Sequence, residues 1–188
     1  MNNRSKIIEQ ALQLFSTRGY DAVGIQEIVD KAKITKPTLY HYFGSKEGLL
    51  KSLLEEHFNR MNREISPAVD YRGDLTLTLR GIVSAYFGFA KRNNVFYRMQ
   101  LTLWFAPPES EAKQSVVEWN NQQYKMVEKV FTAAVKEHGN MKGRQQYYAA
   151  TFIGMINTYI GLYLNKYTEL SEELVYQLVH QFMHGILS

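Results

Sequence analysis

The chain has 188 residues, of which 22 are Lys or Arg, 18 are Asp or Glu, and none is cysteine. Its length favours one large domain or two smaller ones, and its 45% hydrophobic and 21% charged content is typical of a globular protein. The absence of cysteine excludes disulfide scaffolds, thiolate zinc sites, iron–sulfur clusters and cysteine nucleophiles. The first residues also lack the apolar core of a signal peptide, so we expect a cytoplasmic protein.

The excess positive charge lies near the N-terminus. Residues 1–51 carry 8 Lys and Arg against 5 Asp and Glu, whereas the remaining residues carry 14 against 13. A basic segment followed by a nearly neutral one indicates a polyanionic partner for the N-terminal part of the chain.

Apolar residues recur at helical spacing along most of the chain, as in Ile8, Ala11 and Phe15, which share one helix face. Ser5 is expected to cap this first helix and Gly19 to end it. No segment alternates with the period of a strand. The sequence therefore predicts an all-α protein of about nine helices, at about residues 5–18, 25–32, 35–43, 45–64, 75–92, 95–105, 109–138, 144–166 and 171–187.

Two short helices joined by Lys33-Ile34 predict a helix-turn-helix. Leu39 and Phe43 are four residues apart in the second helix and face the core. The remaining side chains combine a cation, a hydroxyl, two phenols and an imidazole, which suit a DNA major groove. These side chains belong to Lys36, Thr38, Tyr40, His41 and Tyr42.

Lys46 follows in the first turn of the next helix. Its ammonium, beside the free N–H groups of that helix, is expected to clamp a phosphate. Short helices with surface tyrosines also occur in bundles that bind no DNA, so the spacing alone leaves both readings open.

The string Thr38-Leu39-Tyr40-His41-Tyr42-Phe43-Gly44-Ser45-Lys46-Glu47, preceded by Gly19-Tyr20, resembles the DNA-binding domain of the TetR family of transcriptional regulators. The resemblance covers about residues 5–55. It implies a helix-turn-helix domain at residues 1–48 and an effector-binding and dimerisation domain at 49–188. It also implies that Thr35 caps the recognition helix and that the DNA contacts come from Arg4, Lys36, Pro37, Thr38, Tyr40, His41, Tyr42 and Lys46.

Two positions depart from the family pattern. Val23 and Gly24 stand where members usually carry hydroxyl residues, so one expected contact from a hydroxyl to a phosphate is missing. Lys33 stands in the turn where glycine is common. A positive φ at Lys33 would cost about 1 kcal/mol or more, and its charge is expected to meet the DNA backbone.

Aromatic residues gather in two later segments, with seven in residues 86–105 and six in residues 147–167. Packing is the simplest role for any one of them, but many are tyrosines, and a buried phenol needs a partner. We therefore expect a cavity for a small lipophilic or aromatic effector, with no cofactor. Its expected lining is Tyr86, Phe89, Met99, Leu103, Trp104, Trp119, Tyr124, Tyr148, Phe152, Met155 and Tyr159.

The last two predicted helices, at about 144–166 and 171–187, carry more apolar and small residues than one copy of the chain needs for its own core. A small-residue stripe, Ala150, Gly154, Thr158, Gly161 and Asn165, allows close approach of another helix. In the family these helices form the dimer interface. A membrane span is not expected, because polar residues interrupt the uncharged segment 145–165.

A metal site is not expected either. His180 and His184 have the spacing of two ligands on one helix face, but no third strong ligand lies near them in the sequence.

These observations predict a homodimeric repressor that binds a palindromic DNA operator. A small molecule in the C-terminal domain would release it by shifting helices, among them the helix at 45–64. The alternative is a DNA-binding regulator that answers to a protein partner or to no ligand. An enzyme is unlikely, because the sequence contains no phosphate-binding glycine loop, nucleophile elbow or metal-ligand cluster.

Overall fold

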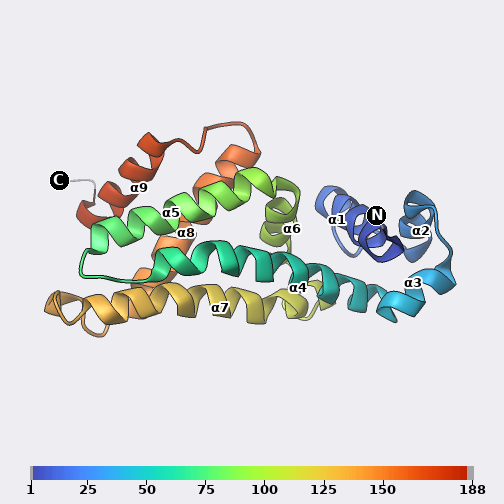
Figure 1. The fold of residues 1–188 in the computed structure, drawn as a ribbon, viewed down its shortest axis with the longest axis horizontal. Coiled ribbons are helices and arrows are strands. Elements are labelled where there is room, and N and C mark those ends of the chain that lie inside the picture. Colours follow the sequence, from blue (N-terminus) through green and yellow to red (C-terminus); the bar gives the residue numbers. More distant parts are fainter. Residues whose placement is uncertain (1, 186–188) are drawn as a thin grey trace. The chain divides into compact units, whose positions relative to one another are not determined.

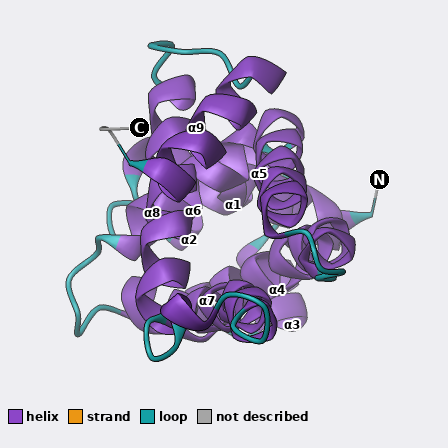
Figure 2. Cartoon of the chain, turned by 90° about the vertical axis from the view of Figure 1, so that its left-hand side faces the viewer, coloured by secondary structure: helices purple, strands orange, loops and turns teal. Residues whose placement is uncertain are grey.

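The computed structural model describes residues 2–185, apart from the side chain of Asn140. In that range it contains nine α-helices, two short 3₁₀ helices and no strand. Figures 1 and 2 show how the helices and their connecting loops are arranged within the fold. The all-α fold predicted from the sequence is confirmed. The elements are α1 (Asn3–Arg18), α2 (Ile25–Ala32), α3 (Lys36–Phe43), α4 (Lys46–Ile65), η1 (Ser66–Val69), α5 (Leu75–Arg92), α6 (Asn94–Trp104), α7 (Glu111–Ala134), η2 (Gly139–Met141), α8 (Gln145–Leu164) and α9 (Glu172–His184).

Capping residues fix several helix ends near their predicted positions. The hydroxyl of Ser171 accepts from the Leu174 N–H at 3.1 Å, and Gly19 ends α1 with a φ of 80°. The predicted cap at Ser5 is wrong, because Asn2 caps α1 and accepts from the Ser5 N–H at 2.9 Å. The last residues of the final predicted helix, including Ile186, lie outside the described residues.

The chain forms two compact units, the first from residues 1–60 and 95–118. In this unit α1, α2 and α3 pack against one another. Phe15 and Leu39 are buried there, as is Phe58 on α4. The ring of Phe96 on α6 stacks against His57 at 4.6 Å and meets Phe58 edge-on at 5.3 Å. Buried aromatic and aliphatic side chains therefore come from the helix-turn-helix, the first part of α4 and α6.

The second unit comprises residues 61–94 and 119–188. Here α5 packs against α8, α9 and η1, and α5 and α9 run side by side in Figure 1. Its core is aromatic, and Phe89, Phe131 and Phe152 are buried in it. Phe182 of α9 joins this core, with its ring 4.9 Å from that of Phe152.

The unit limits fall within α4, within α7 and directly after Asn94, the first residue of α6, so α4 and α7 are divided between the two units. The division into a DNA-binding domain at 1–48 and an effector domain at 49–188 concerns function and stays a prediction. Among residues 2–185, no helix combines the length and the hydropathy needed to cross a membrane.

Candidate nucleic-acid interface and effector pocket

Helix α3 separates core residues from surface residues as its sequence predicts. Leu39 and Phe43 are buried, whereas Tyr40 and Tyr42 are 47% and 43% exposed. The aromatic ring of His41 lies 5.4 Å from that of Tyr42, edge to face. The other candidate DNA contacts are the exposed Lys36 and Pro37 and the half-buried Thr38. One face of α3 thus offers donors and rings to the solvent, which is what groove recognition requires.

Thr35 caps the N-terminus of this helix. Its side-chain oxygen accepts from the Thr38 N–H at 3.4 Å, and the two hydroxyl oxygens lie 2.9 Å apart. The cap fixes the helix start at Lys36, and Pro37 suits the first turn because its missing N–H needs no partner there.

Lys33, in the turn before α3, adopts the left-handed conformation that the sequence analysis considered for this position. Its φ is 54° and its ψ is 50°. Its N–H donates to the Asp30 carbonyl at 3.2 Å, and the Ile34 N–H donates to the Val29 carbonyl at 3.0 Å, which is a Schellman motif. Lys33 therefore stands at a position that favours glycine, and its side chain is exposed. At the other end of α2, Gly24 is the N-cap without a side-chain hydrogen bond.

Lys46, the candidate phosphate ligand at the start of α4, contacts an aromatic ring. Its Nζ lies 4.1 Å from the ring centroid of Tyr20, and burial lowers the pKa of Lys46 while Asp21 and Glu111 oppose this. Tyr20 is buried, and its hydroxyl donates to Glu111 Oε2 at 2.7 Å. Burial first, then the hydrogen bond and the charge of Glu111, raise the pKa of Tyr20 above its usual value.

Arg4 in the N-terminal arm has two partners within this unit. Its Nη1 lies 3.3 Å from Glu56 Oε2, and its guanidinium lies 5.8 Å from the ring centroid of Phe43. A phosphate contact from Arg4 would therefore replace an exposed ion pair, which is a weak interaction.

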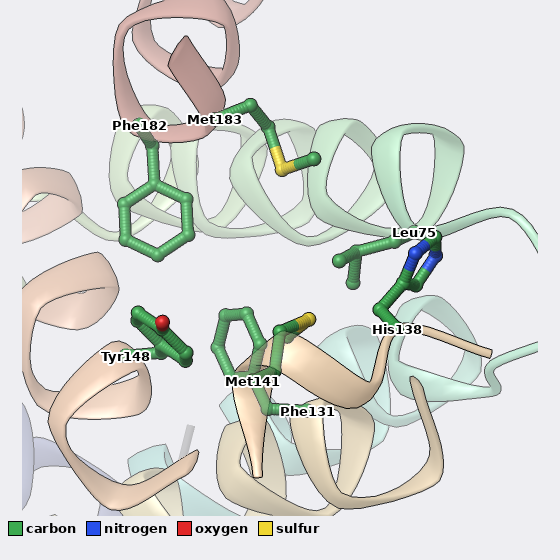
Figure 3. A pocket seen from close by; sticks show the side chains of 7 residues that line it. All are labelled: Leu75, Phe131, His138, Met141, Tyr148, Phe182 and Met183. Carbon is green, nitrogen blue, oxygen red and sulfur yellow. The ribbon is translucent and has the colours of Figure 1, made fainter. Parts of the chain in front are cut away.

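In the second unit, a pocket of about 210 Å³ opens among α5, α7, α8 and α9, beside η2. Figure 3 shows the rings of Phe131, Tyr148 and Phe182 pointing toward one another across it. The ring centroid of Phe131 lies 5.7 Å from that of Tyr148 and 5.9 Å from that of Phe182. The lining is Leu75, Phe131, His138, Met141, Tyr148, Phe182 and Met183. Its aromatic rings and thioethers, with one imidazole and one phenol, are chemically suited to an apolar or aromatic group.

The eleven predicted lining residues divide between the two units. Met99, Leu103 and Trp104 belong to the first unit and the other eight to the second. Tyr148 lines the pocket just described, and Tyr124 lines another of about 270 Å³ between α7 and α8. The remaining six pack in the second unit: Tyr86, Phe89 and Phe152 are buried, and Trp119, Met155 and Tyr159 are half-buried. Their role in binding stays a prediction.

Tyr86 belongs to a buried polar chain. Its hydroxyl donates to Gln123 Oε1 at 2.5 Å, and the Gln123 amide donates to Asn62 Oδ1 at 2.5 Å. Burial raises the pKa of Tyr86 above its usual value, and the nearby Tyr124 adds to this effect. These hydrogen bonds join α5, α7 and α4, and they give the buried Tyr86 hydroxyl the hydrogen-bond partner that a buried phenol needs.

A third pocket of about 440 Å³ lies between η1 and α7 and is lined by Lys125 and Lys129 with Ser66, Val69, Gln122 and Met126. On α9, the His180 and His184 rings lie 4.7 Å apart. Within the described part of the chain, no group of three or more His, Cys, Asp or Glu is placed to hold a metal ion.

Residues 7–53 match the sequence model of the family described as "Bacterial regulatory proteins, tetR family". These residues contain the capped helix α3, its turn and Lys46. Residues 7–53 therefore form a DNA-binding segment of the TetR family. It shares 33% identity over 96 residues with the "HTH-type transcriptional activator FasR" of Mycolicibacterium smegmatis, which covers 51% of this chain and 44% of that protein. The chain spans less than half the length of the curated relatives that it matches at 33–34% identity.

Solved structures share this fold over nearly the whole length of the chain. One is FadR from Bacillus subtilis in complex with stearoyl-CoA, with a TM-score of 0.81 and 19% identity over 97% of this chain and 98% of that one. Another is AibR in complex with isovaleryl coenzyme A and operator DNA, with a TM-score of 0.73 and 20% identity over 96% and 97% of the two chains. At this identity the likeness shows the fold. The names of these relatives are those of regulators, which agrees with the expectation that the chain is not an enzyme.

Sequence reasoning missed six of the seven residues around the aromatic pocket. Phe182 and Met183 lie on the last predicted helix, which the sequence analysis assigns to the dimer interface. The pocket arises because the end of α9 meets the start of α5, and helical periodicity does not show which helix faces which. Tyr20 and Glu111 were missed for the same reason, since 91 positions separate them in the sequence.

Proposed function

We propose that this chain is a dimeric transcriptional regulator that binds a palindromic operator through α3 and the start of α4. The observation that carries the proposal is the division of α3 into a buried pair, Leu39 and Phe43, and an exposed polar face, within the segment that matches the TetR family. We assign Lys36, Pro37 and Thr38 to base edges and the adjacent backbone. Tyr40, His41 and Tyr42 contact bases and phosphates, while Thr35 caps the helix.

The phosphate contacts of this proposal come from the ends of the motif. Lys46 donates beside the N-terminus of α4, and Lys33 projects its charge from the exposed turn before α3. When DNA binds, Arg4 leaves its ion pair with Glu56 and contacts a phosphate instead. A DNA partner of this kind implies a cytoplasmic location.

The dimer of this proposal forms through α8 and α9. Leu162 on α8 and Tyr176 and Met183 on α9 are exposed apolar side chains in the single chain. A Cβ added at Gly154 or Gly161 on α8 would meet no other part of this chain within 4 Å, so both glycines face open space that a second helix can approach. Two α3 helices in a two-fold dimer read a palindrome, whereas one α3 reads a single half-site.

The effector of this proposal is a small lipophilic molecule, and acyl-CoA thioesters are the class to test first. FadR and AibR, whose structures share this fold, are named with stearoyl-CoA and isovaleryl coenzyme A. In this chain the aromatic pocket suits the acyl end, and the pocket with Lys125 and Lys129 suits an anionic group. The aromatic pocket, at about 210 Å³, is smaller than the roughly 300–1,000 Å³ of ligand pockets in general, which favours a short acyl group.

In the proposed mechanism the effector releases the operator, which makes the protein a repressor. The ligand must bind the released state better than the DNA-bound state, because a ligand without such a preference shifts nothing. Helices α4 and α7 each run from one compact unit into the other, so a shift of either helix changes both units.

The test begins with selection of a duplex from a random-sequence pool by the wild-type protein, followed by binding measurements with labelled duplex. We expect a palindromic sequence bound by a dimer, and release by isovaleryl-CoA at lower concentration than by stearoyl-CoA. Recovery of no preferred sequence would contradict the DNA assignment. Tight binding that no acyl-CoA weakens would favour the alternative, a regulator that answers to a protein partner or to no ligand.

A further inference from the structure

The start of α7 touches the DNA-binding helices inside the first unit. Glu111 is the first residue of α7, and its Oε2 accepts the hydroxyl hydrogen of Tyr20 at 2.7 Å. Tyr20 lies just after α1 and is 4% exposed. A hydrogen bond from a hydroxyl to a carboxylate is among the stronger kinds, so it fixes the orientation of the Tyr20 ring.

The face of that ring carries Lys46. Its Nζ lies 4.1 Å from the ring centroid, well within the distance at which a cation and an aromatic ring attract each other. The ring of Phe15 also packs against that of Tyr20, with the two centroids 5.2 Å apart in an edge-to-face arrangement. Donation of the phenol hydrogen to a carboxylate also increases the negative charge of the ring, which strengthens its attraction for the ammonium.

We propose that Glu111 is a positioning residue for DNA binding: by anchoring Tyr20, it holds the ammonium of Lys46 at the N-terminus of α4 for contact with a phosphate. This inference rests on the proposed function, since it assigns Glu111 a role in the DNA contact made by Lys46. A lysine side chain has four rotatable bonds, and ordering it on binding costs affinity. The ring of Tyr20 orders it in advance.

Glu109 and Glu111, just before and at the start of α7, allow a matched comparison of variants. Glu109 is exposed and lies two residues before Glu111, so Glu109→Gln removes the same charge without touching Tyr20. Glu111→Gln also removes the charge but keeps an oxygen that accepts from the Tyr20 hydroxyl. Glu111→Ala removes both, and Tyr20→Phe removes the hydroxyl while the ring remains.

The experiment measures the affinity of these variants for the duplex selected by the wild-type protein, at one salt concentration. Glu111→Ala and Tyr20→Phe should each weaken binding by roughly two- to tenfold, the range for ordering one flexible side chain. Their combination should weaken it no further, because both remove one hydrogen bond. Glu111→Gln and Glu109→Gln should bind within about twofold of wild type. In a Lys46→Ala background, Glu111→Ala should have no further effect, whereas general damage to the fold would still show there.

Affinity of Glu111→Ala within twofold of wild type would overturn the inference. So would an undiminished loss in the Lys46→Ala background, since Glu111 would then act by another route. If the wild-type protein bound no duplex, the proposed function and this inference would fall together. Normal wild-type binding with an inert Glu111→Ala variant would overturn the inference alone.

Discussion

The buried polar chain of the second unit gives the sharpest prediction about stability. Tyr86 is 1% exposed, and its hydroxyl has Gln123 Oε1 as hydrogen-bond acceptor. Gln123 is itself 4% exposed and donates to Asn62. Gln123→Ala removes both bonds, leaves the Tyr86 hydroxyl without this partner, and opens a cavity.

The expected cost follows from these two losses. A buried hydroxyl left without a partner costs about 1–3 kcal/mol, and the lost side-chain packing adds about 1 kcal/mol. The free energy of unfolding should therefore fall by about 3 kcal/mol. For a chain of this length, each kcal/mol lowers the melting temperature by about 2–4 °C, so we expect a fall of about 6–12 °C.

Thermal unfolding followed by circular dichroism measures this change. Gln114→Ala is the matched control, because Gln114 is an exposed glutamine on the same helix and its replacement should change stability by less than about 0.5 kcal/mol. In a Tyr86→Phe background, Gln123→Ala should cost about 1–2 kcal/mol less than in the wild type, because no hydroxyl is then stranded. Equal melting temperatures for Gln123→Ala and Gln114→Ala would refute the reasoning, and so would strictly additive costs.

Three further predictions concern other elements. Lys33→Gly should raise the free energy of unfolding by about 0.5–1 kcal/mol by relieving the positive φ, whereas Lys31→Gly inside α2 should lower it by a similar amount in denaturant titrations. Ser171→Ala should destabilise the protein by about 1 kcal/mol through loss of the α9 cap, and a cost equal to that of an exposed serine elsewhere would contradict this. Because burial raises the pKa of Tyr86, its contribution is complete below pH 10 and is lost as the pH rises toward the folded-state pKa. Stability should therefore fall above pH 10 by up to about 1.4 kcal/mol per pH unit on account of this group, and Tyr86→Phe should show a shallower fall in melting temperature between pH 9 and 11.

Local features of the fold could be predicted from the sequence because their causes are local. The four-residue spacing of Leu39 and Phe43 defines the buried face of α3, and Thr35 defines its start. The consequence of Lys33 in the turn also followed, since only a left-handed residue closes the Schellman motif there. These features involve residues a few positions apart in the chain.

Features that join distant segments could not be predicted in the same way. The aromatic pocket depends on Phe182 of α9 meeting Phe131 of α7, and the sequence shows only that each is apolar on one helix face. The hydrogen bond between Tyr20 and Glu111 is equally invisible, because an acidic residue at the start of a helix is explained by the helix dipole alone. Tertiary packing decides these contacts.

The central claim is that α3 reads DNA, and Lys36→Ala tests it most directly. Affinity for the selected duplex should fall by at least about tenfold, since a side chain that contacts bases is worth about 1–3 kcal/mol. The dimer, measured by analytical ultracentrifugation, should remain intact. Lys51→Ala, which removes an exposed charge of α4 that pairs with Glu47, should bind nearly as the wild type does. Equal affinity of Lys36→Ala and wild type would contradict the assignment of α3 as the recognition helix.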